Sequence, residues 1–168
     1  ARVPKTRVKS AEDSAAANGW KTTISPCKVT EAGRPSAGVA VAVRKHIGMS
    51  WPGQWTAATA PDSDRFTVRR VNAICRGGIH VGSLYCHPVV ALSSKLNLDL
   101  LQEVAGVLKC LTTPWLIAAD WNDTPPSLQD TGWLKMVGGV IAAPTRSTCH
   151  ERVIDFFVIS ESLQHALH

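Results

Sequence analysis

Two stretches of alternating sequence on either side of Gly77 and Gly78 place the strongest constraint on the fold. Residues 65–75 (RFTVRRVNAIC) and 79–88 (IHVGSLYCHP) both repeat with the period of two that is typical of a β-strand. Glycine accepts the positive φ angles that tight hairpin turns require, so these two stretches predict a β-hairpin.

An earlier part of the chain predicts a second pair of strands. Residues 19–26 (GWKTTISP) alternate, and residues 36–47 (SAGVAVAVRKHI) follow after a turn between Gly33 and Gly38. The three valines at positions 39, 41 and 43 would occupy one face of the later strand. The two strands are therefore expected to be linked as a hairpin.

The next part of the chain predicts a helix followed by a buried strand. Residues 93–111 carry apolar side chains at three-and-four spacing, with Ser93 or Ser94 as the N-cap. These apolar positions are Leu96, Leu100, Leu101, Val104, Val107, Leu108 and Leu111. Pro114 and the apolar run WLIAAD come next. Strands joined both by hairpins and through a helix predict an α/β layered fold with mixed β-sheets.

Both ends of the chain predict shorter elements. Residues 1–18 are polar and predict an arm or a frayed helix with Ser10 as its N-cap. Toward the end we expect a short helix over residues 127–136, a break at two glycines and the strand VIAAP. The strand RVIDFFVIS and a capped turn complete the chain, and residues 19–168 are predicted to form one partial domain.

Composition favours one globular domain with a slight preference for polyanionic partners. The chain has 168 residues, of which 45% are hydrophobic and 18% charged, and its formal net charge is +5. A positive balance favours nucleic acid or phosphate esters, although the basic residues are scattered. Their one local concentration consists of Arg65, Arg69, Arg70 and Arg76.

The cysteines and the absence of long apolar runs predict a soluble, intracellular protein, either nuclear or cytoplasmic. Five cysteines form an odd set with no C-x-x-C pair, so we expect reduced and mostly buried thiols. No signal peptide or run of 18 apolar residues is present, and we expect no membrane partner. The first residue, Ala1, hints at a piece of a longer reading frame.

Asp120 and Asn122 form the first candidate site. They follow an apolar strand and are two residues apart, so their side chains would point to the same side. Oxygen donors of this kind suit Mg²⁺, which takes only one or two carboxylates from a protein. The alternative is that Asp120 caps a turn and Asn122 begins an Asx-turn before Pro125.

Two further signals concern single polar residues at or within strands. Asp155 stands in an otherwise apolar strand, so it requires a partner such as a histidine, a lysine, a metal ion or backbone amides. The alternative is a partly exposed edge-strand aspartate. Tyr85 and His87 close another strand, where His87 could meet a phosphate or simply lie at the surface.

Four motifs, in order, resemble the endonuclease/exonuclease/phosphatase superfamily, whose members include apurinic endonucleases, DNase I and the endonuclease domains of non-LTR retrotransposons. Residues 36–47 resemble its glycine-led strand, and VGSLYCHP resembles its v-Y-x-P strand. PWLIAADWN resembles the G-D-F-N strand with Ala119 in place of glycine. Residues 143–160 resemble the P-T … I-D-(Y/F) segment. The resemblance runs from about Gly19 to the end of the chain.

The resemblance implies a DNase I-like sandwich of two mixed β-sheets flanked by helices, and a phosphodiesterase that uses Mg²⁺ or Mn²⁺. Asp120 would position the attacking water and share the metal ion through water, and Asn122 would hold that water and the phosphate. Asp155 would orient a catalytic histidine. Nucleic acid, DNA more than RNA, would be the partner, with Tyr85, His87, Arg69 and Arg70 as candidate substrate-binding residues.

The chain departs from the superfamily pattern at both ends. The family's S-D-H histidine follows the aspartate, but His165 and His168 do not match that motif. An N-terminal Q-E-T glutamate binds the metal in the family, and here VPKTRV would place Lys5 at its position unless that glutamate lies upstream. The sandwich is therefore expected to be incomplete, without its first and last strands.

The sequence leaves three functions open. The first is an endonuclease domain whose own activity is in doubt, or a lipid or inositol phosphatase with the same mechanism. The second is an inactive remnant or nucleic-acid-binding module. The third is a generic α/β domain, which predicts that Asp120 and Asp155 lie far apart. The superfamily hypothesis instead predicts that these two aspartates, Asn122 and either Tyr85 or His87 converge at one rim of the sheets.

Overall fold

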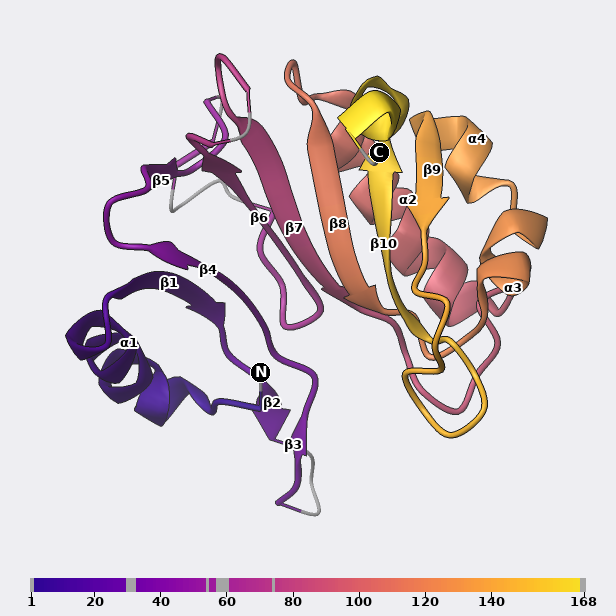
Figure 1. Ribbon diagram of the computed structural model, residues 1–168. Helices are drawn as coiled ribbons and strands as arrows, with labels where there is room; N and C mark the ends of the chain where they lie inside the picture. Colours follow the sequence, from indigo (N-terminus) through magenta and orange to yellow (C-terminus); the bar gives the residue numbers. More distant parts are fainter. Residues whose placement is uncertain (1, 30–32, 54, 57–60, 74, 167–168) are drawn as a thin grey trace. The chain divides into compact units, whose positions relative to one another are not determined.

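The computed structural model describes residues 2–29, 33–53, 55–56, 61–73 and 75–166. Contacts divide the chain into two compact units, Ala1–Ser83 and Leu84–His168. The strands form a six-stranded sheet in the order β5-β6-β7-β8-β10-β9 and two smaller sheets, β1-β4 and β2-β3 (Figure 1). The predicted α/β class is confirmed. Strand β7 (Ile79–Tyr85) contributes residues to both units.

The first unit begins with helices and not with a loose arm. The 3₁₀ helix η1 (Lys5–Arg7) leads into α1 (Val8–Ala17), which packs beside β1 (Trp20–Ser25) (Figure 1). The predicted cap at Ser10 is wrong, because α1 begins at Val8 and its N-cap position is Arg7, three residues before Ser10.

Strand β1 pairs antiparallel with β4 (Val39–Arg44), as predicted for these two stretches. The ladder runs from the pair Trp20 and Arg44 to the pair Ser25 and Val39. The connection is more than a turn, because it contains a small ladder of its own, β2 (Lys28–Val29) with β3 (Pro35–Ser36).

The core of the first unit lies between β4 and the antiparallel pair β5 (Met49–Ser50) and β6 (Phe66–Val71). Its buried members are Val41, Val43, Met49 and Val71. The alternation of β4 places its valines on one face, as predicted. Strand β6 differs, because its residues are buried on both faces.

The turn between β6 and β7 contains two glycines with the positive φ angles that were predicted. Gly77 has φ +89° and Gly78 has φ +76°. A Cβ at Gly78 would lie 2.5 Å from the backbone oxygen of Val71, so this position excludes any side chain.

In the second unit, α2 (Lys95–Lys109) lies against one face of β8 (Trp115–Asp120), β10 (Asp155–Ser160) and β9 (Gly139–Ala142) (Figure 1). Strand β10 pairs antiparallel with β8 on one side and β9 on the other. The 3₁₀ helix η2 (Glu161–Ala166) follows β10.

Helix α2 agrees with its prediction except at its start. Ser94 is the N-cap and accepts a hydrogen bond from the backbone N of Asn97 at 3.5 Å. Leu96 was expected on the apolar face but is 52% exposed, whereas Asn97 is fully buried. The apolar stripe therefore begins at Leu100 and has a polar residue at its N-terminal end.

The predicted helix over residues 127–136 is two short helices, α3 (Pro125–Asp130) and α4 (Trp133–Val137). Gly132, with φ +72°, separates them. Trp133 in α4 and Trp121 after β8 meet edge to face, with ring centroids 5.8 Å apart. The indole of Trp121 also stacks on Phe156 in β10, and its N–H donates to the Phe156 carbonyl at 3.1 Å. These rings close the core beside the end of β8.

The cysteines are free thiols, but the expectation that most are buried is wrong. Cys27 and Cys86 are buried, whereas Cys75 and Cys110 are exposed and Cys149 is half-buried. No helix within the described residues is long and apolar enough to cross a membrane.

Candidate active site

Asp120 and Asp155 face each other across two neighbouring strands. Asp120 is the last residue of β8 and Asp155 is the first residue of β10, and the two are direct partners in the antiparallel register. Opposed residues in such a ladder have neighbouring side chains on the same face of the sheet. The predicted convergence of these aspartates is confirmed, and the generic α/β hypothesis, which separated them, is wrong on this point.

Asn122 joins the pair through a turn at the end of β8. Its φ of +55° is a left-handed conformation that asparagine tolerates better than most residues. Its backbone N donates to Oδ1 of Asp120 at 3.1 Å, and its side-chain Nδ2 donates to the Cys86 carbonyl at 3.0 Å. Asp120 therefore also caps a turn, as the alternative interpretation proposed.

Cys86 connects the end of β7 to this turn. Its backbone N donates to the Asp120 carbonyl at 3.0 Å, and its own carbonyl accepts from Asn122. Tyr85 and His87, the two candidates from the v-Y-x-P motif, flank Cys86 and are both half-buried. The chain thus brings all five candidate residues of this unit to one rim, while their chemical roles stay predictions.

Asp120 and Asp155 are like charges on opposed positions of two strands, and this affects the pKa of Asp120. Burial raises the pKa of the half-buried Asp120 carboxyl above 3.8. The hydrogen bond from Asn122 opposes this shift in pKa, and the negative charge of Asp155 adds to it. Such a site favours the arrival of a proton or a cation.

Asp155 differs from its prediction in one respect. Its side chain is exposed and not enclosed in the core, because β9 begins to pair with β10 only at Phe157. β10 is nevertheless not an edge strand. The backbone N atoms of Ile154 and Asp155 both donate to Oγ1 of Thr148 at 3.0 Å, which fixes the start of the strand.

The donors at this rim fit a magnesium ion in a limited way. Among the described residues, no group of three or more His, Cys, Asp and Glu side chains could hold a metal ion. The two opposed carboxylates are hard oxygen donors, and Mg²⁺ usually keeps several waters and needs only one or two carboxylates. Asp120 and the neighbouring Asp155 are therefore the residues that could hold a magnesium ion at this rim.

Two polar residues next to the site were missed by the sequence analysis. Asp123 accepts backbone hydrogen bonds from Thr124 at 2.8 Å and from Leu92 at 3.3 Å. Asn97 bonds to the backbone of residues 87, 90 and 91. A signal for Asn97 was present, because it lies four residues before Leu101 on the apolar face of α2.

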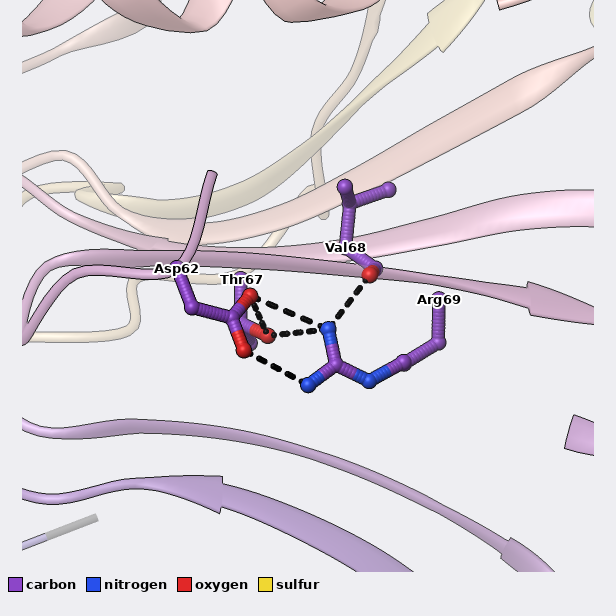
Figure 2. Close-up of polar contacts among 4 residues, drawn as sticks. All are labelled: Asp62, Thr67, Val68 and Arg69. Carbon is purple, nitrogen blue, oxygen red and sulfur yellow. Dashed lines mark hydrogen bonds and ion pairs between the residues drawn. The ribbon is translucent and has the colours of Figure 1, made fainter. Parts of the chain in front are cut away.

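Arg69, in the first unit, does not have the free guanidinium that a substrate-binding role requires. It is 2% exposed. Figure 2 shows its two terminal nitrogens on the Asp62 carboxylate, at 3.0 and 2.6 Å, with Thr67 and the Val68 carbonyl completing the cluster. Its guanidinium carbon also lies 3.4 Å from the centroid of the Trp51 ring. This arrangement supports a structural role for Arg69.

Arg70 is half-buried and is also engaged with its own chain. Its Nε and Nη2 atoms donate to the Gly77 carbonyl at 3.0 and 2.7 Å. These bonds hold the turn between β6 and β7. A contact with substrate remains a prediction for Arg70.

Structures of known proteins share this fold. The endonuclease domain of TRAS1, a telomere-specific non-LTR retrotransposon, matches with a TM-score of 0.56 and 14% identity over 95% of this chain and 81% of that one. The 3'-5' exonuclease NExo from Neisseria meningitidis matches with a TM-score of 0.57 and 15% identity over 99% and 76%. The AP endonuclease LMAP from Leishmania major matches with a TM-score of 0.52 and 11% identity over 93% and 67%.

These likenesses show that the chain has a DNase I-like fold. No protein-family model matches the sequence. No curated protein matches it either.

Proposed function

We propose that this chain is a phosphodiesterase domain that depends on a divalent metal ion and cleaves nucleic acid, DNA in preference to RNA. The observation that carries the proposal is the register that opposes Asp120 to Asp155, with Asn122 bonded to Asp120 at the same rim. Known structures with the same fold, an endonuclease domain, an exonuclease and an AP endonuclease, support the class of reaction.

Each residue has a role suited to its chemistry. Asp120, whose pKa burial raises, would position the attacking water and accept its proton. Asn122 has one amide hydrogen committed to Cys86, so its second amide hydrogen would hold the phosphate or the water. Asp155 is exposed beside them, where it would orient a histidine or join Asp120 in holding the metal ion.

The proposed cofactor is Mg²⁺ or Mn²⁺, held by Asp120 with Asp155 as its neighbour. When bound, such an ion stabilises the negative charge that develops on the phosphoryl oxygens. The protein's part is to supply oxygen donors and to hold Asn122 at the scissile group.

The substrate assignment depends on charge and on the site's surroundings. A net charge of +5 favours a polyanion. His87 and Tyr85 flank Cys86, which bonds to Asn122, and are candidates to contact a phosphate. We further propose that residues 19–168 represent part of one such domain, with no membrane partner.

A catalytically inactive module of the same fold is the second candidate. It is favoured by one sequence observation: if VPKTRV corresponds to the Q-E-T segment, Lys5 stands at the position of the metal-binding glutamate. A lysine ammonium has no lone pair for a metal while it is protonated, so it cannot replace that carboxylate.

Nicking of supercoiled plasmid DNA by the purified chain, with and without Mg²⁺ or Mn²⁺, tests the proposal. We expect metal-dependent nicking that falls by about 100-fold or more in Asp120→Ala and Asn122→Ala. Asp130→Ala is the matched control, because Asp130 is an exposed aspartate at the end of α3. A folded chain that binds plasmid but never nicks it would overturn the catalytic proposal and favour the inactive module.

A further inference from the structure

The two units of the chain differ in net charge. Residues 1–83 contain thirteen Lys and Arg against five Asp and Glu, a formal charge of +8, whereas residues 84–168 contain five against eight, a charge of −3. The candidate site lies in the acidic unit. The positive charge is therefore concentrated in the unit to which no reaction has been assigned, and such an excess favours a polyanionic partner.

The basic unit contains two contacts between an arginine and a tryptophan, and their surroundings differ. Arg69 lies over Trp51, is 2% exposed and bonds to the Asp62 carboxylate. Arg44 lies over Trp20, with its guanidinium carbon 4.1 Å from the ring centroid, and is exposed. None of the ion pairs among the described residues includes Arg44. The indole thus orients the Arg44 guanidinium, whose planar set of N–H groups suits an external anion.

Arg44 also begins a turn that carries further basic side chains. The backbone N of Ile47 donates to the Arg44 carbonyl at 2.9 Å and closes the turn. Lys45 and His46 lie within it and are exposed. The backbone N of Lys45 donates to the Gly19 carbonyl at 3.0 Å, which fixes the turn to the chain that enters β1.

A second basic turn, between β6 and β7, is bonded to the first. The backbone N of Gly78 donates to the Cys75 carbonyl at 2.9 Å and closes this turn around Arg76, which is exposed. The backbone N of Asn72 donates to the carbonyl of Gly48, the residue that follows the first turn, at 2.9 Å. We call residues 44–47 and 75–78 the basic turns.

The chain around the basic turns contains no acidic residue. Residues 32–61 and 65–98 include neither Asp nor Glu. The three ion pairs of this unit, among the residues that the structure describes, use cations outside the basic turns: Lys9 with Asp13, Lys28 with Asp64 and Arg69 with Asp62. Like charges held close together repel each other, and a bound polyanion removes that repulsion.

We propose that the basic turns bind the phosphodiester backbone of a nucleic acid, with Arg44, Lys45 and Arg76 each contacting a phosphate. The choice of nucleic acid among polyanions rests on the proposed function. This contact is separate from the candidate site, because the seven residues of β7 lie between the second turn and Cys86, which bonds to Asn122. It strengthens the binding of long substrates and takes no part in the chemical step.

The side chains of the basic turns suit a phosphate better than a lipid surface. Basic segments that lie on membranes usually insert apolar side chains beside their cations. Within the part of the chain that the structure describes, the large exposed apolar side chains all lie outside the basic turns. A guanidinium fixed on an indole can instead donate two parallel hydrogen bonds to one phosphate.

The experiment removes three positive charges from the basic turns and, as the control, three from other exposed positions. The test variant is Arg44→Gln/Lys45→Gln/Arg76→Gln, and the control variant is Lys9→Gln/Lys28→Gln/Lys109→Gln, which changes the net charge equally. A third variant, Arg44→Lys/Arg76→Lys, keeps the charge of the basic turns. Urea denaturation establishes that each variant is folded before binding is compared.

Binding of a DNA duplex of about 30 base pairs is measured in EDTA between about 50 and 200 mM salt. Each phosphate contact contributes about 0.9 to the slope of log K against log salt, so the test variant should lose about 2–3 from that slope. We expect it to bind about tenfold more weakly or worse at about 100 mM salt, while the control and charge-keeping variants retain most of the slope. Equal slopes in the test and control variants would overturn the proposal.

Two other polyanions test the class of partner. Vesicles of phosphatidylcholine and phosphatidylserine, and polyglutamate at the same charge concentration as the duplex, replace the DNA in the same experiment. We expect the basic turns to contribute little to the binding of either. A loss of binding to vesicles or polyglutamate in the test variant as large as the loss for DNA would overturn the assignment to nucleic acid.

Cleavage separates this contact from the proposed function. We expect the test variant to nick plasmid more slowly at low DNA concentration and at the unchanged rate at saturation. It should hydrolyse thymidine 5'-(p-nitrophenyl) phosphate, which has no extended backbone, as the unchanged chain does. Failure of the unchanged chain to cleave either substrate would overturn the proposed function, while the slopes measured in EDTA would still decide whether the basic turns bind DNA.

Discussion

The two units of this chain surround a carboxylate with different partners. In the first unit Asp62 receives both terminal nitrogens of the buried Arg69, at 2.6 and 3.0 Å, and Thr67 donates to the same carboxylate at 2.8 Å. In the second unit Asp120 is opposed in the strand register by another carboxylate, that of Asp155, and it accepts a backbone hydrogen bond from Asn122.

This difference separates a structural pair from a candidate site. A buried ion pair with its hydrogen bonds made has no remaining need for a ligand. Two opposed carboxylates retain unbalanced negative charge, which raises the pKa of one of them in addition to the effect of burial. The first arrangement should therefore matter for the stability of the fold, and the second for binding and chemistry.

The largest effect is expected when the structural pair is broken. Arg69→Met keeps the length of the side chain but leaves Asp62 without its cation, and Asp62 is only 22% exposed in its side chain. Loss of one partner of a buried pair costs about 3–5 kcal/mol. We expect a decrease of about this size in the free energy of unfolding, measured by urea denaturation.

Arg70→Met provides the matched control on the neighbouring residue. Arg70 donates to the Gly77 carbonyl in a more exposed position, so its loss should cost about 1 kcal/mol. The double variant Arg69→Met/Asp62→Asn should recover part of the lost stability, because it leaves no unpaired charge. Equal effects of Arg69→Met and Arg70→Met would contradict the structural assignment of Arg69.

The sequence was sufficient to locate the candidate site because its signals are local. Asp120 and Asn122 end an apolar strand, Asp155 interrupts another, and the order of the motifs linked them. The alternation predicted which face of each strand lies on the core, but the register that opposes Asp120 to Asp155 is known only from the structure. The same alternation did not reveal that Asp155 lies outside the part of β10 covered by β9.

Other features depended on contacts between distant segments. The alternation of β6 predicts a face for Arg69, but only the fold brings Asp62 and Trp51 to it. Asn97 lies on an apolar helix face, yet its partners are in a loop that no periodicity describes. The sequence therefore could not show that the Arg69 guanidinium is paired with a carboxylate of its own unit.

A smaller effect is expected at Asp123, where hydrogen bonds balance the carboxylate in the second unit. Burial acts to raise its pKa, but bonds from Ser127, Thr124 and Leu92 outweigh burial, and the pKa is lowered from 3.8. The native state thus binds this proton less tightly than the unfolded state does. Its stabilising effect is present above pH 3.8 and is lost as the pH falls through the lowered pKa.

Asp123→Asn removes this titration and replaces an acceptor oxygen with a donor. We expect it to destabilise the chain at pH 7 by about 1–3 kcal/mol, and the difference from the unchanged chain to shrink below pH 3.8. Urea denaturation across pH 3–7 measures it, with Asp130→Asn as the exposed control on α3. A difference that stays constant with pH would show that Asp123 does not act through its charge.

The smallest effect, and the one that most directly tests the like-charge pair, concerns the pKa of Asp120 in Asp155→Asn. The main cause of the raised pKa is burial, so the pKa should stay above 3.8 after the neighbouring charge is removed. The negative charge of Asp155 opposes ionisation of Asp120, so its removal should lower the pKa of Asp120 part of the way. Carboxyl ¹³C NMR measures this titration, and Asp130→Asn should leave it unchanged.

Addition of Mg²⁺ should lower the pKa of Asp120 further in the unchanged chain than in Asp155→Asn, because the second carboxylate helps to hold the cation. An identical titration of Asp120 in both chains would mean that the two carboxylates are not close enough to form one site, and the contrast with the Asp62 and Arg69 pair would then be one of burial alone.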